Sequence, residues 1–262
     1  MYKNILKTIV LLSSLQAIAQ ENPNDVSENY FTVNDTVKKL KEVVVTAKNN
    51  PSKSSVNRAG IKEKDLPQAV QVIGTEIIQQ QQSVRLSDVV KNANGVYVGS
   101  ARGGAQESFW SRGYDMSANN MFKNGFRFNS GSIPEVSSLE KVEILKGSAA
   151  LLYGNVAPGG IMNMVTKTPN FKTGGEFTMQ AGSYNFYKPS ADVYGAFNNS
   201  IAYRFNGSYE NSESFRDYVT KERYYVNPSL LFKVSDKTEI TLQADYLSDD
   251  WTPDFGTGSI GK

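Results

Sequence analysis

The chain has 262 residues, of which 39% are hydrophobic and 21% are charged, and its 28 basic residues nearly balance its 26 acidic ones. It contains neither cysteine nor histidine, which excludes thiolate and imidazole chemistry, the usual kind of zinc site and a Ser-His-Asp triad within these residues. The sequence has no cluster of basic residues that would predict binding to nucleic acid. Beyond the N-terminus no run approaches the ~20 apolar residues of a membrane helix, so membrane insertion would have to use β-strands.

The N-terminus has the pattern of a secretory signal peptide. Lys3 and Lys7 precede an apolar stretch at 9–15, and the small-residue sequence AIA follows at 17–19. A buried N-terminal helix is the alternative interpretation. We predict cleavage after Ala19, which N-terminal sequencing or the intact mass of the exported protein measures directly. Retention of this leader in the mature protein would contradict the export interpretation.

Residues 20–60 are predicted to form a polar arm that carries one short strand. The first twenty of them are polar and aperiodic, which is typical of a segment without a packed core. Residues 41–48, KEVVVTAK, then place three valines and a threonine between charges, a β-forming pattern. From these residues alone an ordinary edge strand is an equal interpretation, but the position between two polar segments favours a strand that binds a partner.

Residues 61–170 predict a small mixed α+β domain. The expected elements are a strand at 69–73, helices at 75–82 and 83–94, a strand at 96–98, and strands in 109–113, 121–128, 142–145 and 161–165. Ser83 or Ser87 is the expected cap of the second helix and Gly95 its stop signal. The glycines between the last two strands indicate a tightly wound strand-turn-strand unit.

Residues 171–262 change to strands that alternate between apolar and polar residues. Five strands are expected, at 176–184, 189–198, 201–211, 222–234 and 237–250. A soluble sandwich also alternates, but short links at 198–200 and 235–237 and a longer link at 212–221 follow the order of periplasmic turns and extracellular loops. Five strands cannot close a barrel around a domain of about 100 residues, so we expect the chain to be part of a longer reading frame.

Several stretches together resemble the plug domain of TonB-dependent outer-membrane receptors, especially those for ferric siderophores. Residues 139–169 read LEKVEILKGSAALLYGNVAPGGIMNMVTKTP, and DLPQAVQVI, NGVYV, SRGY and KNG precede them in the family's order. The resemblance covers roughly residues 42–169. It implies an α+β plug domain followed by the first strands of a transmembrane antiparallel β-barrel, incomplete in this chain. The implied domains are a signal peptide (1–19), an arm (20–60), the plug (61–170) and the first barrel strands (171–262).

The resemblance also implies three groups of functional residues. The TonB box, which would add a strand to the sheet of TonB, consists of Glu42, Val43, Val44, Val45, Thr46 and Ala47. Ligand-binding residues at the plug apex would be Arg102, Gln106, Ser117, Asn119, Phe128 and Asn129. Arg112 and Lys146 would form an ionic lock between plug and barrel, although a lysine at 146 cannot make the bidentate contact of an arginine.

The function implied by the resemblance is TonB-dependent import of a ferric siderophore across the outer membrane of a Gram-negative bacterium. The expected partners are TonB of the inner-membrane energy-transducing complex, the ferric siderophore and outer-membrane lipid, with no nucleic acid. No catalytic residue, resident metal or cofactor is expected, because iron would enter only as the siderophore complex. Import of cobalamin or an oligosaccharide is the nearest alternative. A passive pore or a surface-binding protein belongs to a different class and should lack a plug and a TonB box.

Overall fold

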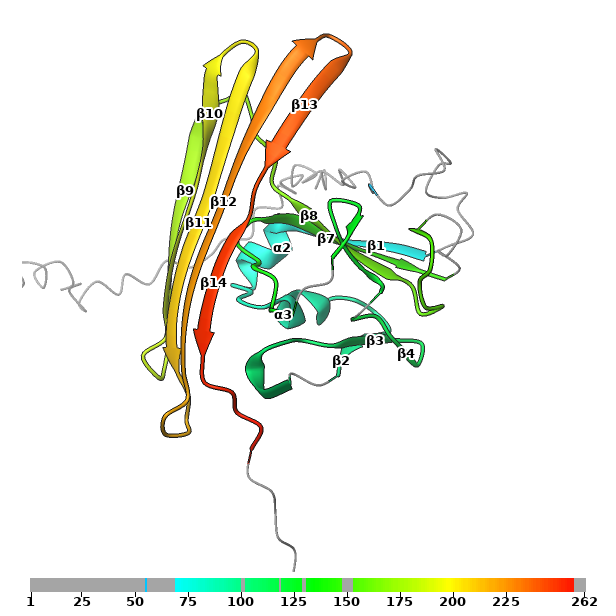
Figure 1. Cartoon of the computed structure of the whole chain (residues 1–262), viewed down its shortest axis with the longest axis vertical. Helices are drawn as coiled ribbons and strands as arrows, with labels where there is room; N and C mark the ends of the chain where they lie inside the picture. Colours follow the sequence, from blue (N-terminus) through cyan, green and yellow to red (C-terminus); the bar gives the residue numbers. More distant parts are fainter. Residues whose placement is uncertain are drawn as a thin grey trace, which may run out of the picture. The chain divides into compact units, whose positions relative to one another are not determined.

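The computed structural model describes residues 55, 69–99, 102–117, 119–128, 131–147 and 153–256. The predicted signal peptide and TonB box lie outside these residues. Two sets of strands follow one another along the described chain, a mixed set with short helices and then a set of long antiparallel strands (Figure 1). None of the helices among the described residues is long and apolar enough to cross a membrane.

The first set of strands contains a five-stranded sheet and a three-stranded sheet. The five-stranded sheet has the order β1-β7-β8-β5-β6, and the small sheet has the order β2-β3-β4. The strands are β1 (Ala69–Gly74), β2 (Val96–Val98), β3 (Phe109–Ser111), β4 (Tyr114–Asp115), β5 (Met121–Lys123), β6 (Phe126–Arg127), β7 (Leu139–Lys146) and β8 (Ile161–Thr166). The helices are α2 (Thr75–Gln80), α3 (Leu86–Val90) and the single-turn η3 (Arg102–Gly104).

Both α-helices are shorter than predicted, and neither Ser83 nor Ser87 caps α3. The Asp88 carboxylate instead accepts hydrogen bonds from the backbone N–H groups of Val84 (3.3 Å) and Arg85 (3.1 Å). The bond from Asp88, at the third helical position, back to the N-cap backbone is one of the two bonds of a capping box, and it fixes the start of α3 at Leu86. The predicted stop signal does not end the helix either, because α3 ends at Val90 with Lys91 as its C-cap. Gly95 instead lies in the turn before β2 with φ +68°, a conformation that glycine adopts without a Cβ penalty.

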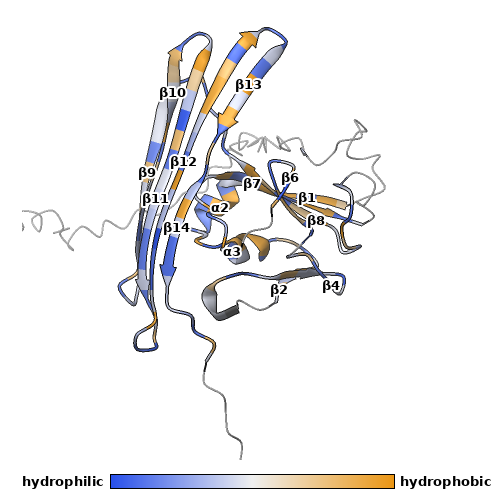
Figure 2. Cartoon of the chain, in the orientation of Figure 1, coloured by the Kyte–Doolittle hydropathy of each residue, from blue (hydrophilic) through white to orange (hydrophobic). Residues whose placement is uncertain are grey.

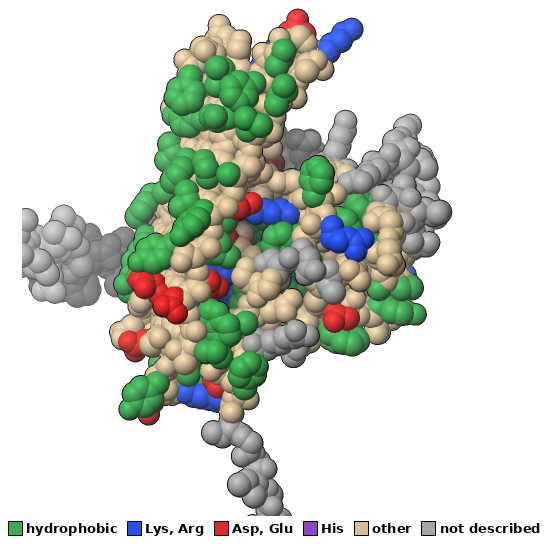
Figure 3. All heavy atoms as spheres, viewed as in Figure 1, with side chains coloured by type: hydrophobic (Ala, Val, Ile, Leu, Met, Phe, Trp, Pro, Cys, Tyr) green, Lys and Arg blue, Asp and Glu red, His purple; other side chains and the backbone are tan. Residues whose placement is uncertain are grey.

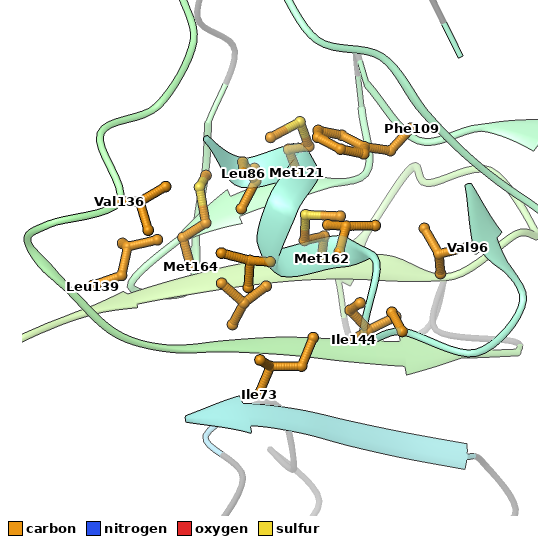
Figure 4. Close-up of a cluster of buried hydrophobic side chains, with 14 of the residues drawn as sticks. Ile73, Leu86, Val96, Phe109, Met121, Val136, Leu139, Ile144, Met162 and Met164 are labelled. Carbon is orange, nitrogen blue, oxygen red and sulfur yellow. The ribbon is translucent and has the colours of Figure 1, made fainter. Parts of the chain in front are cut away.

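The core of this part lies between α2, α3 and the five-stranded sheet. Ile73 of β1, Ile144 of β7, and Met162 and Met164 of β8 point toward Leu86 and neighbouring apolar residues of α3 (Figure 4). Each of these side chains is buried, and full burial of such a side chain is worth about 1.5–3 kcal/mol. The sheet and helices therefore form a domain with its own core.

The predicted strand-turn-strand unit is present as the pair β7–β8. The two strands are antiparallel, with Val142 opposite Met164 and Ile144 opposite Met162. Gly160 has φ +120°, and a Cβ there would collide with the backbone carbonyl of Leu145. Glycine is thus required where the returning chain passes closest to β7.

The second set forms a sheet of long antiparallel strands. Its strands are β9 (Gly174–Ala181), β10 (Tyr187–Asn198), β11 (Ile201–Glu213), β12 (Thr220–Ser235), β13 (Thr238–Gln243) and β14 (Tyr246–Trp251). The order is β13-β12-β11-β10-β9, and β14 also pairs with β12. Two-residue turns connect β10 to β11 and β12 to β13, while residues 214–219 form the longer link at the other end, as predicted.

One face of this long-strand sheet contacts the plug-like domain, and the other is apolar and exposed. Hydrophobic and hydrophilic residues alternate along the strands (Figure 2), and hydrophobic side chains gather on the surface of the sheet (Figure 3). On the outer face Phe177 is 73% exposed and Leu242 is 57% exposed. On the inner face Lys188, Asp192 and Arg223 are buried. The predicted two-sided alternation is therefore correct.

The fifth predicted strand, 237–250, is interrupted. β13 and β14 both pair with β12 in one continuous register, with Gln243 opposite Ser229 and Tyr246 opposite Val226. The gap lies opposite Pro228, which has no N–H to donate to the ladder. The side chain of Asn227 supplies the missing donor to the carbonyl of Ala244 (3.0 Å). A proline in the neighbouring strand thus explains why one predicted strand is two.

Candidate functional site

A pocket of about 280 Å³ lies where η3 meets one end of the long-strand sheet. On the domain side it is lined by Arg85, Gly103 and Gly104, and on the sheet side by residues 212–214, 219–221 and 251–254 except Pro253. This is the end of the sheet with the long β11–β12 link. The structure therefore brings part of the predicted apical loop, 99–108, against the strand ends that the sequence assigns to the extracellular side.

Contacts between the chain after β14 and η3 close one side of this pocket. The backbone N–H of Asp254 donates to the carbonyl of Gly103 (3.0 Å). A Cβ on Gly103, which has φ +63°, would lie 3.1 Å from the ring of Phe255. Arg216 of the β11–β12 link forms an ion pair with Asp254 (2.5 Å). Gly103 thus permits a close approach of Phe255 that a Cβ would crowd.

Charged groups of both signs line the pocket, the basic Arg85 and Lys221 and the acidic Glu213 and Asp254. Asp254 is already paired with Arg216. Lys221 is engaged by Glu210 (3.0 Å), whereas the guanidinium of Arg85 makes no hydrogen bond or ion pair within the described part of the chain. Guanidinium and ammonium groups donate charge-assisted hydrogen bonds to carboxylate and other oxygen acceptors. Arg85 was missed by sequence reasoning, because nothing in its local pattern distinguishes it from a solvated helix-end residue.

Of the six residues predicted to bind ligand, the structure describes the side chains of four. The backbone of Arg102 begins η3, but its side chain and all of Asn129 lie outside what is described. Gln106, Ser117, Asn119 and Phe128 do not line the pocket.

Three of those four side chains have contacts within the domain. The hydroxyl of Ser117 accepts a hydrogen bond from the N–H of Phe109 (3.0 Å), and Asn119 accepts one from Arg127 (3.1 Å). Phe128 packs against the hydrophobic core. A role in ligand binding stays a prediction for all six residues.

The two residues of the predicted ionic lock contact no acidic group of the long-strand sheet among the residues described. Lys146 donates hydrogen bonds to the carbonyl of Asn94 and to the side chain of Gln71 (3.5 Å). Burial, followed by the nearby charge of Arg112, lowers the pKa of Lys146. Arg112 itself is exposed and has φ +53°. The lock function of both residues stays a prediction.

Two of the ion pairs that join the two parts share one acid, Glu135, which lies just before β7. Its carboxylate is 2.7 Å from Lys188 Nζ on β10 and 3.6 Å from Arg223 on β12, and these three side chains are 0%, 3% and 2% exposed. Arg223 also contacts Asp249 of β14 (2.8 Å) and donates to the carbonyl of Ile133 (2.5 Å). We call Glu135, Lys188 and Arg223 the Glu135 cluster.

The charge state of Glu135 follows from these neighbours. Burial alone would raise the pKa of its carboxyl group, but Lys188 and Arg223 together with a backbone hydrogen bond from Ser137 lower the pKa to about 2. The group is thus ionised at any physiological pH. Removal of one member of such a cluster is costly, because it leaves the other buried charges uncompensated.

Two further polar contacts join the parts on either side of this cluster. Lys167, after β8, pairs with Asp192 of β10 (2.9 Å), which also binds Arg204 of β11 (2.6 Å). Lys123 of β5 pairs with Asp245 in the gap between β13 and β14 (2.7 Å). No group of three or more His, Cys, Asp or Glu residues that could hold a metal ion was found in the described ranges.

Comparison with known proteins defines the class. Residues 62–161 match the TonB-dependent Receptor Plug Domain family. The chain is 31% identical to the metal-pseudopaline receptor CntO of Pseudomonas aeruginosa over 215 residues, covering 78% of this chain and 29% of that protein. It is 30% identical to the ferrioxamine B receptor of Salmonella typhimurium over 240 residues, covering 87% of this chain and 32% of that protein.

A solved structure shows the same arrangement. The ferric-catecholate import receptor Fiu of E. coli K12 superposes with a TM-score of 0.68 at 29% sequence identity, covering 75% of this chain and 29% of that chain. The chain therefore spans about a third of the length of the curated relatives that it matches.

The chain belongs to the TonB-dependent receptors, and it is related to their siderophore and metallophore receptors. The predicted fold class, an α+β plug domain followed by strands that match the start of a receptor barrel, is confirmed. This family consists of outer-membrane receptors of Gram-negative bacteria, which are transporters and not enzymes. The five-stranded sheet and its helices are accordingly called the plug below, and the long-strand sheet is called the barrel sheet.

Proposed function

We propose that the protein imports a ferric siderophore across the outer membrane. The observation that carries this proposal is the pocket between η3 and the barrel sheet, at the end of the sheet that the sequence assigns to the extracellular side. Relatives of similar identity are named as receptors for ferrioxamine B and for catecholate siderophores. The proposed domain organisation is the one expected from the sequence, in which the plug spans residues 61–170 and the barrel strands begin at residue 171.

The pocket chemistry supports a ligand rich in oxygen acceptors. Ferric hydroxamates and catecholates present oxygen atoms and apolar edges. Arg85 and Lys221 would donate to the oxygen atoms, and Trp251 offers an aromatic surface in the same lining. The iron is cargo, and the proposal assigns no resident cofactor.

Energy would be supplied through residues 42–47. A strand of this type binds by adding to an exposed sheet edge of its partner, using backbone hydrogen bonds. We propose TonB as that partner. Force on residues 42–47 in the periplasm would then act through the plug on the ligand bound in the pocket at the outer side.

The experiment is a binding titration of the intact purified receptor with defined chelates. Ferrioxamine B represents the hydroxamates, and the ferric complex of 2,3-dihydroxybenzoylserine represents the catecholates. Saturable binding of one iron-loaded chelate, with much weaker binding of its iron-free form, is the expected result. Binding of vitamin B12 or an oligosaccharide instead would contradict the siderophore assignment.

A second candidate cargo is a metal complex of a metallophore of the pseudopaline kind. It is favoured by the similarity to the metal-pseudopaline receptor, at 31% identity. The same titration separates the two candidates when nickel- and zinc-loaded metallophores are included beside the ferric chelates.

Arg102→Ala is expected to weaken capture of the ferric ligand by one to two decades in Kd. Loss of a charge-assisted hydrogen bond costs about 1.5–3 kcal/mol, and Arg102 opens η3, whose glycines line the pocket. The measurement is the titration above, with Gln106→Ala as a matched control in the same loop. Equal affinities of wild type and Arg102→Ala would contradict the role. If only Gln106→Ala weakens binding of the ligand, the ligand-binding role belongs to Gln106 and not to Arg102.

A further inference from the structure

The arm that precedes the plug is bound to the plug sheet at Ser55. The backbone N–H of Ser55 donates to Glu143 Oε1 (2.7 Å), and its hydroxyl donates to Glu143 Oε2 (2.6 Å). Glu143 lies on β7, and its side chain is 0% exposed. One serine thus occupies both oxygens of a buried carboxylate, which is a strong and geometrically specific contact.

Glu143 has two further hydrogen-bond donors, both from the sheet itself. Lys141 Nζ lies 2.9 Å from Oε1, and Asn163 Nδ2 lies 3.1 Å from Oε2. Asn163 is directly opposite Glu143 on β8, and its Oδ1 accepts a hydrogen bond from the N–H of Gly125 (2.9 Å), in the turn between β5 and β6. The carboxylate therefore links the arm to β7 and β8, and through Asn163 to the β5–β6 turn.

Departure of Ser55 would leave this carboxylate with half of its four donors. Burial acts to raise the pKa of Glu143, and the hydrogen bonds from Lys141, Ser55 and Asn163 reverse that effect, so the group is held ionised. A buried ionised carboxylate without enough donors is costly. Release of the arm is thus coupled to destabilisation of the β7–β8 pair at the centre of the plug sheet.

Ser55 is also close in sequence to the segment on which TonB is proposed to act. It lies eight positions after Ala47, the last residue of that segment. Eight residues span at most roughly 26–29 Å when fully extended. A pull on residues 42–47 therefore reaches Ser55 after at most that much slack has been taken up.

We propose that the pair Ser55–Glu143 transmits tension on residues 42–47 into the plug sheet, and that breaking it loosens β7 and β8. The Ser55–Glu143 clasp holds while ligand binds and opens when the arm is pulled. This inference rests on the proposed coupling through residues 42–47, but it is independent of the cargo.

The test is single-molecule pulling on the intact receptor in a lipid bilayer, without ligand, through a handle attached at Ala47→Cys. The wild-type clasp is expected to give a first force peak within the slack length, followed by extension of the chain beyond residue 55. Ser55→Pro removes both the N–H and the hydroxyl, and it is expected to abolish this peak. Ser55→Ala removes only the hydroxyl, and it is expected to lower the peak force while keeping its position.

Ser54→Ala is the matched control, since it makes the same chemical change at the adjacent serine, and its trace should equal that of the wild type. A first peak of unchanged force in both Ser55→Ala and Ser55→Pro would overturn the proposal, as would a wild-type trace with no peak before residue 55 is extended. If Ser55→Pro does not insert into the membrane, Ser55→Ala against Ser54→Ala decides. A receptor that shows the clasp but binds no ferric chelate would contradict the proposed cargo and leave the clasp standing.

Discussion

Glu135→Ala is expected to destabilise the docking of the plug against the barrel sheet by about 3–5 kcal/mol, because it removes the single acid shared by two buried cations. Lys188 and Arg223 are almost fully buried. Arg223 keeps Asp249 as a partner, and Glu210, 3.7 Å from Lys188, compensates that lysine only in part. The measurement is the urea midpoint for plug unfolding in the detergent-solubilised intact receptor, followed by hydrogen exchange of plug peptides.

Glu140→Ala is the control for this prediction. Glu140 is an exposed glutamate on β7, and its loss should change stability by no more than about 0.5 kcal/mol. Glu135→Leu combined with Lys188→Met removes both charges and should recover most of the stability lost in Glu135→Ala. If Glu135→Ala unfolds at the wild-type midpoint, the Glu135 cluster does not hold the plug.

The Glu135 contribution also has a defined pH dependence. Its pKa is lowered from 4.5 to about 2 on folding, so the folded state binds this proton less readily than the unfolded state. The stabilisation is then fully present above about pH 4.5 and is lost as pH falls from there through about pH 2. The difference in unfolding midpoint between wild type and Glu135→Ala should therefore be constant from pH 5 to pH 8 and should shrink below pH 4.

Val44→Pro is expected to abolish uptake while ligand affinity stays at the wild-type value. Proline has no backbone N–H, so it interrupts the strand that residues 42–47 are predicted to add to TonB. Val44 lies outside the described residues, and the prediction rests on the sequence pattern KEVVVTAK. Binding is measured by titration of the purified receptor, and uptake by iron accumulation in cells.

Val44→Ala serves as the control, since it shortens the same side chain and keeps the backbone donor, and it should retain most of the uptake. Wild-type uptake by the Val44→Pro receptor would rule out residues 42–47 as the coupling segment. Loss of ligand binding in the same variant would place the segment in the binding site instead.

The order of the elements could be predicted from the sequence because hydrophobic periodicity is a local property. Alternation over 201–211 corresponds to β11, and the glycines after β7 correspond to the close return at Gly160. The interruption between β13 and β14 had a visible signal in Pro228, whose missing N–H disturbs the strand beside it. The predicted start of α3 was wrong because a serine was expected to cap the helix. The carboxylate of Asp88, which lies within the helix, instead accepts a hydrogen bond from the backbone N–H of Arg85.

The contacts between the plug and the barrel sheet could not be predicted in the same way. Arg223 and Ile133 are 90 residues apart in sequence, and their meeting depends on the register of several strand pairs and on how the plug packs against the sheet. A one-residue change of register would turn Arg223 toward the outer face. Family resemblance directed attention to Arg112 and Lys146, while the most deeply buried ion pairs between plug and barrel sheet in the described residues are made by Glu135, Lys188 and Arg223.

The most direct test of the proposed function is uptake of radioactive iron, supplied as ferrioxamine B or as the ferric complex of 2,3-dihydroxybenzoylserine, by cells that express the intact receptor. We expect saturable uptake of at least one of these chelates, and loss of that uptake when an uncoupler dissipates the proton gradient, with ligand binding at the cell surface unchanged. Uptake that continues at full rate without the proton gradient would contradict TonB-dependent import of a ferric siderophore, and so would a receptor that binds and imports neither chelate.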